Sequence, residues 1–383
     1  MKKNLFLLLC ALPAILLIFG LPGCTKDDGD DVIVPTVKAF AGTESCKSCH
    51  SGIHSSYMES GHPYKLQKVS GAQPTIPFAP TILTPTGYTW NDLSYIIGGY
   101  GWKARFIDKN GYVITQVAGS QFNPGNLTQT IYNSAIPNGT EKYTCGRCHT
   151  TGWKSIADGG TPQDGLPGMD GNFFAGGVQC EQCHGMGNIH AVTKKKSDIT
   201  LDKTTEACSQ CHQRRKLNGD VKQQVSNGWE MHRSQVEQLL TNKHNLTLTC
   251  NSCHEVHSST VKDDLAKGNG ISKTCVSCHN TINANVHNGA TCIDCHMSKT
   301  VKNAISFNKY KGDAPNHNFK INTSATATYL TTDGSGTWAN LDGKGTTLDF
   351  ACYSCHQDTA GVGGIYSKKT MQELATKAIT FHK

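Results

Sequence analysis

Sixteen cysteines and eight histidines of this chain recur in one short pattern, Cys-x-x-Cys-His. Two thiols at this spacing can form thioethers with the two vinyl groups of one haem, and the adjacent histidine then lies where it can ligate the iron. The pattern therefore predicts eight covalently attached haems c. The attachment cysteines would be Cys46, Cys49, Cys145, Cys148, Cys180, Cys183, Cys208, Cys211, Cys250, Cys253, Cys275, Cys278, Cys292, Cys295, Cys352 and Cys355, and the proximal ligands His50, His149, His184, His212, His254, His279, His296 and His356.

Zinc sites and redox-active dithiols also use Cys-x-x-Cys spacing, and a disulfide framework uses paired cysteines. None of these requires a histidine in the fifth position of every copy. Of the 18 cysteines, Cys10 and Cys24 are the two that lie outside the motifs. Haem attachment is the interpretation that accounts for all the others.

Nine of the 17 histidines lie outside the motifs and are candidates for the second axial position. Four of them follow a motif within a few residues, where they could reach a neighbouring haem. We predict eight distal ligands, His54, His62, His190, His232, His244, His257, His287 and His317. The ninth, His382, follows an expected capping box at Thr370–Glu373 and would share one face of a C-terminal helix with Met371 and Leu374.

Ligation by two histidines leaves no open position on the iron, which suits electron transfer and disfavours substrate binding. We therefore predict an electron-transfer protein with no catalytic residues. The alternative is a multihaem oxidoreductase acting on a small nitrogen or sulfur compound. It requires an open haem, and so requires that some of these histidines are not ligands.

The first residues predict export and lipidation. Lys2 and Lys3 precede an apolar run that ends in Leu21-Pro22-Gly23-Cys24, which resembles a lipobox with residues 1–23 as the signal peptide. The alternative is a single membrane-spanning anchor. Residues 24–42 begin with an acidic stretch and would form a tether, similar to lipoprotein signals for surface export. We expect an outer-membrane lipoprotein, at the cell surface or on the periplasmic face.

Composition favours a fold built around its cofactors. Hydrophobic residues make up 37% of the chain and there are 39 glycines, which is little material for a protein core. We predict a multihaem cytochrome c fold, mostly irregular with short α-helices around a haem chain and a small β-element near residues 75–120. A hairpin would turn at Asp108–Gly111 between strands 102–107 and 111–115, and 229–240 would be a helix carrying His232.

The formal net charge of +7 does not indicate a nucleic-acid partner. Each haem brings two propionates, which offset the excess of lysine and arginine. We therefore expect clusters such as Lys194-Lys195-Lys196 to face propionates or solvent.

Several segments carry a family resemblance. Ser60-Gly61-His62 resembles cytochrome c554-type domains. Residues 87–92, 98–106 and 177–185 resemble the filament-forming outer-surface cytochromes of the OmcE type. The likeness covers roughly residues 43–215, and in such cytochromes a histidine placed like His317 is usually a distal ligand. It implies an N-terminal tetrahaem domain at 43–235, followed by a second at 236–383. The four further haems and the lipid anchor depart from the OmcE pattern.

These observations predict electron transfer at the outer membrane or cell surface, to redox partner proteins or extracellular acceptors. The resemblance implies a possible head-to-tail homopolymer in which His54 or His62 is donated between subunits. A subunit whose main role is structural polymerisation is a further alternative.

Overall fold

The computed structural model describes residues 33–214, 222–262, 264–266, 269–283, 287 and 289–382. The predicted signal peptide, Cys24 and the acidic start of the tether lie outside these residues. Within them, no helix has both the length and the apolar character needed to cross a membrane.

The helices are short, as expected for a chain that wraps cofactors. They are α1 (Thr43–Lys47), α2 (Ser51–Met58), α3 (Gly146–His149), α4 (Cys180–His184), α5 (Asn188–Thr193), α6 (Thr205–His212), α7 (Gln235–Leu240), α8 (Cys292–His296), α9 (Leu348–Cys352) and α10 (Met371–Ala378). Single 3₁₀ turns complete the set at η1 (Trp90–Asp92), η2 (Gln163–Gly165), η3 (Lys196–Asp198), η4 (Lys243–Leu246), η5 (Cys250–Ser252) and η6 (Cys275–Ser277). All eight motifs begin in, end in or form one of these helical turns.

A five-stranded antiparallel sheet forms between the first two motifs. Its order is β1 (Leu66–Lys68), β2 (Leu93–Gly98), β3 (Ala104–Asp108), β4 (Gln121–Asn123) and β5 (Thr128–Thr130). Its core is fully buried around Leu93, Ile96, Phe106 and Phe122. The sheet therefore reaches beyond the small element expected near residues 75–120.

The predicted turn at Asp108–Gly111 is confirmed. The Asp108 carboxylate accepts hydrogen bonds from the backbone N–H of Asn110 and of Tyr112, and Gly111 has a φ of +87°. The second arm of the hairpin forms only a bridge between Ile107 and Val113. The regular partner of β3 is β2, whose apolar run supplies a better buried surface.

A second sheet of six strands was not predicted. Its order is β13 (Lys311–Ala314), β12 (Val301–Asn308), β11 (Trp229–Glu230), β10 (Gln223–Ser226), β16 (Gly336–Ala339) and β15 (Leu330–Asp333). Two-stranded pairs add β6 (Thr150–Thr151) with β9 (Ala175–Gly176), β7 (Lys154–Ser155) with β8 (Gly171–Asn172), and β14 (Ile321–Asn322) with β17 (Thr346–Thr347). The β-element expected near residues 75–120 is therefore present, but it belongs to a larger sheet, and the second sheet was not expected.

The predicted helix at 229–240 was also wrong over its first half. Trp229–Glu230 is a strand, and α7 starts only at Gln235. Arg233, between them, has a left-handed backbone with φ of +71°, which cannot continue an α-helix. The C-terminal capping box is confirmed, because Thr370 and Glu373 each bond the other's backbone N–H. His382 lies beyond the end of α10.

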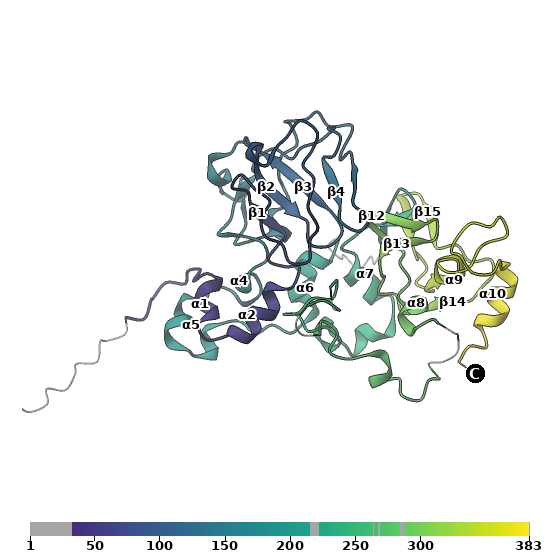
Figure 1. Ribbon diagram of the computed structural model, residues 1–383. Coiled ribbons are helices and arrows are strands. Elements are labelled where there is room, and N and C mark those ends of the chain that lie inside the picture. Colours follow the sequence, from purple (N-terminus) through teal and green to yellow (C-terminus); the bar gives the residue numbers. More distant parts are fainter. Residues whose placement is uncertain are drawn as a thin grey trace, which may run out of the picture.

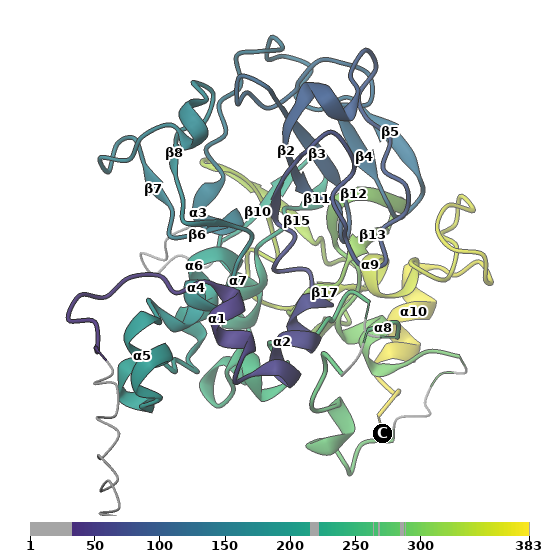
Figure 2. The same ribbon diagram turned by 60° about the vertical axis from the view of Figure 1, so that its left-hand side comes forward.

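Figure 1 shows how these parts are arranged. In this view the five-stranded sheet lies above the motif helices α4 and α6. The elements β12, β13 and α8 to α10 lie to the right of it, near the C-terminus. Figure 2 shows the same order from another direction. The loop after β2 joins the two sides, because the Trp102 indole N–H donates to Asp313 O at 3.1 Å and Lys103 Nζ donates to Asn303 O at 2.8 Å.

Candidate haem-binding site

Four motif histidines, His149, His184, His296 and His356, have a backbone carbonyl within hydrogen-bonding distance of Nδ1. The Nδ1 of His149 lies 3.0 Å from Lys65 O, that of His184 lies 2.8 Å from Thr200 O, and that of His296 lies 2.7 Å from Phe319 O. A carbonyl can only accept, so Nδ1 carries the proton. The Nε2 lone pair then remains available for iron, as in metal-binding histidines generally.

The sixteen motif cysteines are all free thiols, with no disulfide among the described residues. This is the state that thioether formation with haem vinyl groups requires.

Seven motif histidines each face one histidine from outside the motifs. Two imidazoles that bind one iron from opposite sides, at about 2 Å each, place their ring centroids about 6 Å apart. The centroid distances here range from 5.8 to 6.3 Å. The pairs are His50 with His190, His212 with His62, His184 with His257, His279 with His244, His254 with His317, His356 with His287, and His296 with His382.

The geometry differs from the predicted ligand set in three residues. Six of the eight predicted distal histidines face a motif histidine, but His54 and His232 do not. His382, which was left out of the set, faces His296 at 5.9 Å. Of the motif histidines, His149 faces no histidine ring among the described residues. Sequence spacing could not assign His382, because it is 86 residues from its partner along the chain and meets it only through folding.

Burial favours the neutral form of three of the paired rings, which is the form that iron ligation requires. Burial lowers the pKa of His62 to about 3 and that of His317 to about 3. Burial and the nearby Lys65 likewise lower the pKa of His212 to about 4.

The cysteines bring the motifs together in a definite order. The thiols of Cys46 and Cys180 lie within hydrogen-bonding reach of each other, which places the first motif beside the third. The same contact joins Cys208 to Cys250, and so the fourth motif to the fifth. Cys183 interacts electrostatically with Cys208, which connects the third motif to the fourth.

The row continues through the C-terminal half. Cys253 interacts electrostatically with Cys278, and Cys275 hydrogen-bonds to Cys292. The eighth motif follows the seventh, because Cys352 lies near Cys295. The attachment sites thus run in the order one, three, four, five, six, seven, eight.

The second motif lies to the side of this row. Cys148 hydrogen-bonds to Cys211 of the fourth motif. Their helices also touch, because the Cys148 thiol lies 4.0 Å from Gln210 O and the Cys211 thiol lies 3.8 Å from Arg147 O. The second motif therefore joins the row at the fourth.

The surroundings of the second motif are strongly basic. Lys65, Lys103 and Arg233 act electrostatically on His149, and burial with Lys65 lowers the pKa of that histidine to about 4. Arg233 Nη1 lies 3.6 Å from the Cys148 thiol. Burial first, and then the neighbouring cations, lower the pKa of His232 to about 2.

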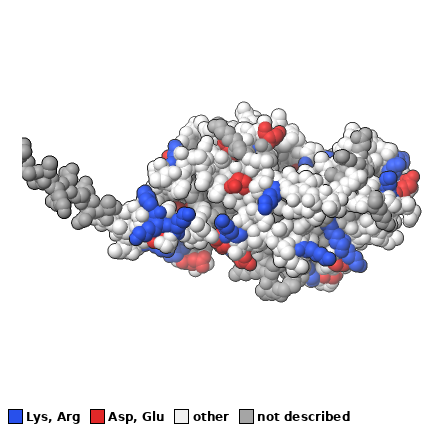
Figure 3. Space-filling model, turned by 90° about the horizontal axis from the view of Figure 1, so that it is seen from below, with Lys and Arg blue, Asp and Glu red and all other residues white. Residues whose placement is uncertain are grey.

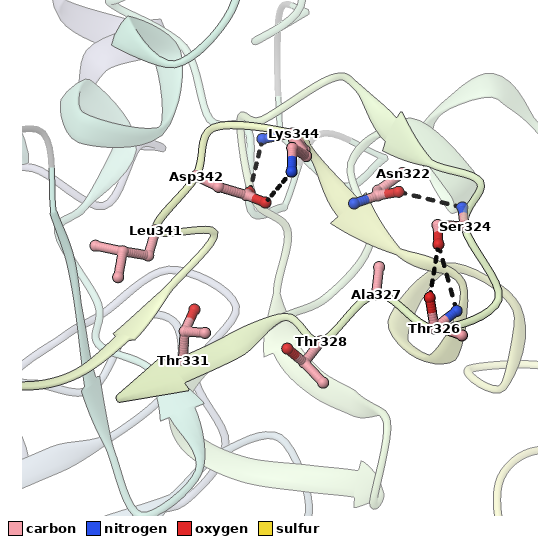
Figure 4. Close-up of a pocket in the computed structure, with 9 residues that line it drawn as sticks. All are labelled: Asn322, Ser324, Thr326, Ala327, Thr328, Thr331, Leu341, Asp342 and Lys344. Atoms are coloured by element: carbon pink, nitrogen blue, oxygen red, sulfur yellow. Dashed lines mark hydrogen bonds and ion pairs between the residues drawn. The ribbon is translucent and has the colours of Figure 1, made fainter. Parts of the chain in front are cut away.

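Two surface cavities among the described residues lie away from the motifs. A cavity of about 460 Å³ is lined by Asn322, Ser324, Asp342 and Lys344 and their neighbours, and Figure 4 shows the ion pair between Asp342 and Lys344 on its rim. A second, of about 570 Å³, lies beside Trp229 and Phe350. Neither is lined by a motif residue. Figure 3 shows acidic and basic side chains interspersed over one face, without a large area of one sign.

Two segments match known families. Residues 123–185 match the family described as cytochrome c554 and c-prime, and residues 244–284 match the doubled CXXCH motif. No curated protein matches this chain significantly.

Two solved structures share the fold, and a third is less similar. The outer cell wall cytochrome OcwA superposes with a TM-score of 0.54 at 19% identity, covering 88% of this chain and 86% of that one. The octaheme sulfite reductase MccA of Wolinella succinogenes superposes with a TM-score of 0.58 at 18% identity, covering 90% of this chain and 67% of that one. An undecaheme cytochrome from the S-layer of Carboxydothermus ferrireducens gives 0.42 at 20% identity, over 71% of this chain and 46% of that one.

The motifs with free thiols, the histidine pairs at the spacing of iron ligands, the two family matches and the shared fold agree. This chain has the fold of the multihaem c-type cytochromes and binds haem c covalently through Cys-x-x-Cys-His motifs.

Proposed function

We propose that this protein carries eight haems c and transfers electrons along them at the outer membrane or cell surface. The observation that carries the proposal is the set of seven histidine pairs, each joining one motif histidine to one other histidine at 5.8 to 6.3 Å. A haem held by two histidines gains and loses an electron with little change in coordination.

The protein positions the haem attachment sites and the ligand rings. It brings successive attachment sites close together, so that electrons can pass between neighbouring haems over short distances. It also holds the ligand rings through carbonyl bonds such as His184 to Thr200 and His296 to Phe319. Ligand rings held in this way keep the coordination geometry of the iron similar in its two oxidation states.

The location rests on two features. The N-terminal pattern that ends in Cys24 favours export and lipidation, and acyl chains add about 0.8 kcal/mol of membrane affinity per buried CH₂. OcwA, which shares the fold, is an outer cell wall cytochrome. We propose redox proteins or extracellular acceptors as the partners.

Intact-mass spectrometry of the mature protein combined with a coulometric titration tests the proposal. We expect eight haems and eight electrons taken up per chain, followed by delivery of these electrons to a soluble iron(III) chelate. Fewer haems on fully matured protein would contradict the count. A reduced protein that cannot pass electrons to any external acceptor would contradict the function.

Cys24→Ser tests the anchor. The variant should fail normal lipoprotein processing or be released from the membrane fraction, with Cys10→Ser as the matched control in the signal segment. Unchanged membrane association of the Cys24 variant would overturn lipidation. Protease treatment of intact cells would then show whether the protein faces outward.

A further inference from the structure

We propose that the end of the molecule around α5 binds the surface of an anionic lipid bilayer and holds the first motif close to the membrane. The inference rests on the lipid anchor of the proposed function and adds an orientation to it. The binding surface consists of residues 33–38 and the three lysines at 194–196 that follow α5, and we call it the α5 surface.

The N-terminal segment meets the folded chain at α5. The side chain of Asn188, the first residue of this helix, accepts from the Ala39 N–H at 2.8 Å and donates to Val37 O at 2.9 Å. Figure 1 shows this segment beside α1 and α5, at the end of the molecule opposite α10. Ile33 is nine residues after Cys24, and an extended chain of that length spans about 30 Å. Acyl chains on Cys24 would therefore keep this end near the bilayer.

Exposed apolar side chains lie directly after the predicted tether. Ile33 is 88% exposed, Val34 45% and Val37 75%. Single exposed aliphatic side chains are common on soluble proteins, but here three lie within five residues and next to the predicted anchor. Entry into the boundary between lipid headgroups and acyl chains would remove this apolar surface from water.

Unpaired positive charge lies beside this apolar segment. Lys38 and the three lysines at 194–196 are all exposed. None of these four forms an ion pair with another described residue, and Lys194 Nζ donates to the carbonyl of Ala191. The carboxylate of Asp198, close to them in sequence, accepts from the Thr193 hydroxyl at 2.5 Å. Figure 3 shows a group of basic side chains at this end of the molecule.

An anionic bilayer fits these features better than a single bound phosphate does. Lysines on a surface without a pocket match the diffuse negative charge of lipid headgroups, and each one strengthens binding by about fivefold. The apolar segment adds contacts that a free anion would not use. Two competitors could occupy the same lysines, namely haem propionates and the aspartates at 27–31 of the predicted tether.

Binding through the α5 surface sets the direction of the haem row. α5 carries His190, which faces His50 of the first motif at 6.3 Å. The eighth motif lies at the opposite end of the molecule, where α9 packs against α10 (Figures 1 and 2). The first haem would then be close to the membrane, and the eighth would face away from it.

The test uses the full lipidated holoprotein in two kinds of vesicle, one of phosphatidylcholine alone and one that also contains phosphatidylglycerol. Amine-reactive labelling and mass spectrometry measure the exposure of each lysine. Labelling of Lys38 and of the lysines at 194–196 should fall about fivefold in the anionic vesicles and recover at high salt. Lys109, at the hairpin turn, and Lys368, after the eighth motif, should label equally in both.

The outcomes separate the anchor from the α5 surface. A protein that does not enter either vesicle would count against the lipid anchor of the proposed function. An anchored protein whose lysines at 194–196 label equally in both vesicles would overturn only this inference. Lysines that are already protected in neutral vesicles would show that they contact propionates or the acidic tether, and this result would also overturn lipid binding.

Charge variants provide the matched comparison. Replacement of the three lysines at 194–196 by glutamine should abolish the protection of Lys38 in anionic vesicles. The control replaces Lys368, Lys369 and Lys377 by glutamine, which removes the same charge from the opposite end, and it should leave Lys38 protected. Haem content by intact mass confirms that both variants mature. Equal protection of Lys38 in the two variants would overturn the role of the α5 surface.

Discussion

At the scale of single residues, a distal ligand is identified by the motif histidine that it faces in the fold. Its distance from that histidine along the chain varies widely. His190 is 140 residues from His50, and His317 is 63 residues from His254, yet each pair has the same separation in space. The motif cysteines and proximal histidines could be predicted from local spacing, because thioether chemistry requires residues adjacent in sequence. Distal histidines depend on packing, which explains why His382 was missed and His54 and His232 were included.

His317→Ala tests this assignment at a buried pair. Because His317 faces His254 at 6.1 Å, its loss should add one high-spin haem to the spectrum and leave the haem count unchanged. Electron paramagnetic resonance measures the change. His54→Ala is the control, since His54 faces no motif histidine, and should add none. Equal effects of the two substitutions would contradict the pairing.

The orientations of the ligand rings predict spectral classes. The rings of His62 and His212 are nearly perpendicular at 86°, whereas those of His184 and His257 are nearly parallel at 5°. Perpendicular ligand planes leave the iron orbitals close in energy and give a strongly anisotropic low-spin signal. His62→Ala should therefore remove a signal of this type, and His257→Ala should remove one of the ordinary rhombic type. The reverse assignment would show that the planes rotate on haem binding.

At the scale of elements, local sequence signals predicted the hairpin turn and the helix cap. They did not predict the full extent of the first sheet or the existence of the second. The Asp108–Gly111 turn and the Thr370 capping box each depend on residues within four positions, so the sequence contains their full cause. The six-stranded sheet pairs Glu230 with Val301 and Gln223 with Ala339, contacts between strands of two to eight residues that carry little pattern of their own. Pairings of this range follow from the whole fold.

Glu181 connects the segments that carry the first and third motifs, and it should stabilise both. It is only 5% exposed, and its carboxylate accepts from the backbone N–H groups of Ala41, Gly42 and Gly187 at 2.7 to 2.9 Å. Glu181→Ala leaves three donors unpaired and should lower the free energy of unfolding by about 3 kcal/mol. Thermal denaturation measures this, with the exposed Glu206→Ala as the control. A loss equal to that of the control would contradict the role.

Glu230 plays a similar part in the second sheet. It is 1% exposed, and it accepts from the Tyr329 hydroxyl, the Gln238 amide and the Thr300 hydroxyl. Burial raises the pKa of Glu230 to about 7. Glu230→Ala should lower the free energy of unfolding by about 3 kcal/mol, whereas Glu230→Gln should lower it much less because it keeps the shape and one acceptor. Similar denaturation curves for the two variants would show that the network contributes little.

At the scale of the whole molecule, the histidine pairs limit which histidine could link subunits in a polymer. His62 already faces His212 of the same chain, so His54 is the one of the two predicted inter-subunit ligands that has no motif histidine opposite it. The His54 side chain is only 11% exposed. If filaments form through His54, electron microscopy should show them in the wild type and not in His54→Ala. Filaments in both would exclude this residue as the link.

The pairing of His184 with His257 predicts what happens when the chain is truncated between its two halves. His184 belongs to the third motif, and its partner lies beyond residue 236, the expected boundary between two tetrahaem halves. A chain ending at 235 would therefore hold four haems but leave one of them without its second histidine. With His184 and His257 on one haem, as proposed, residues from both sides of position 236 would bind the same iron. The reduction potential of that haem would then show whether the C-terminal half is in place.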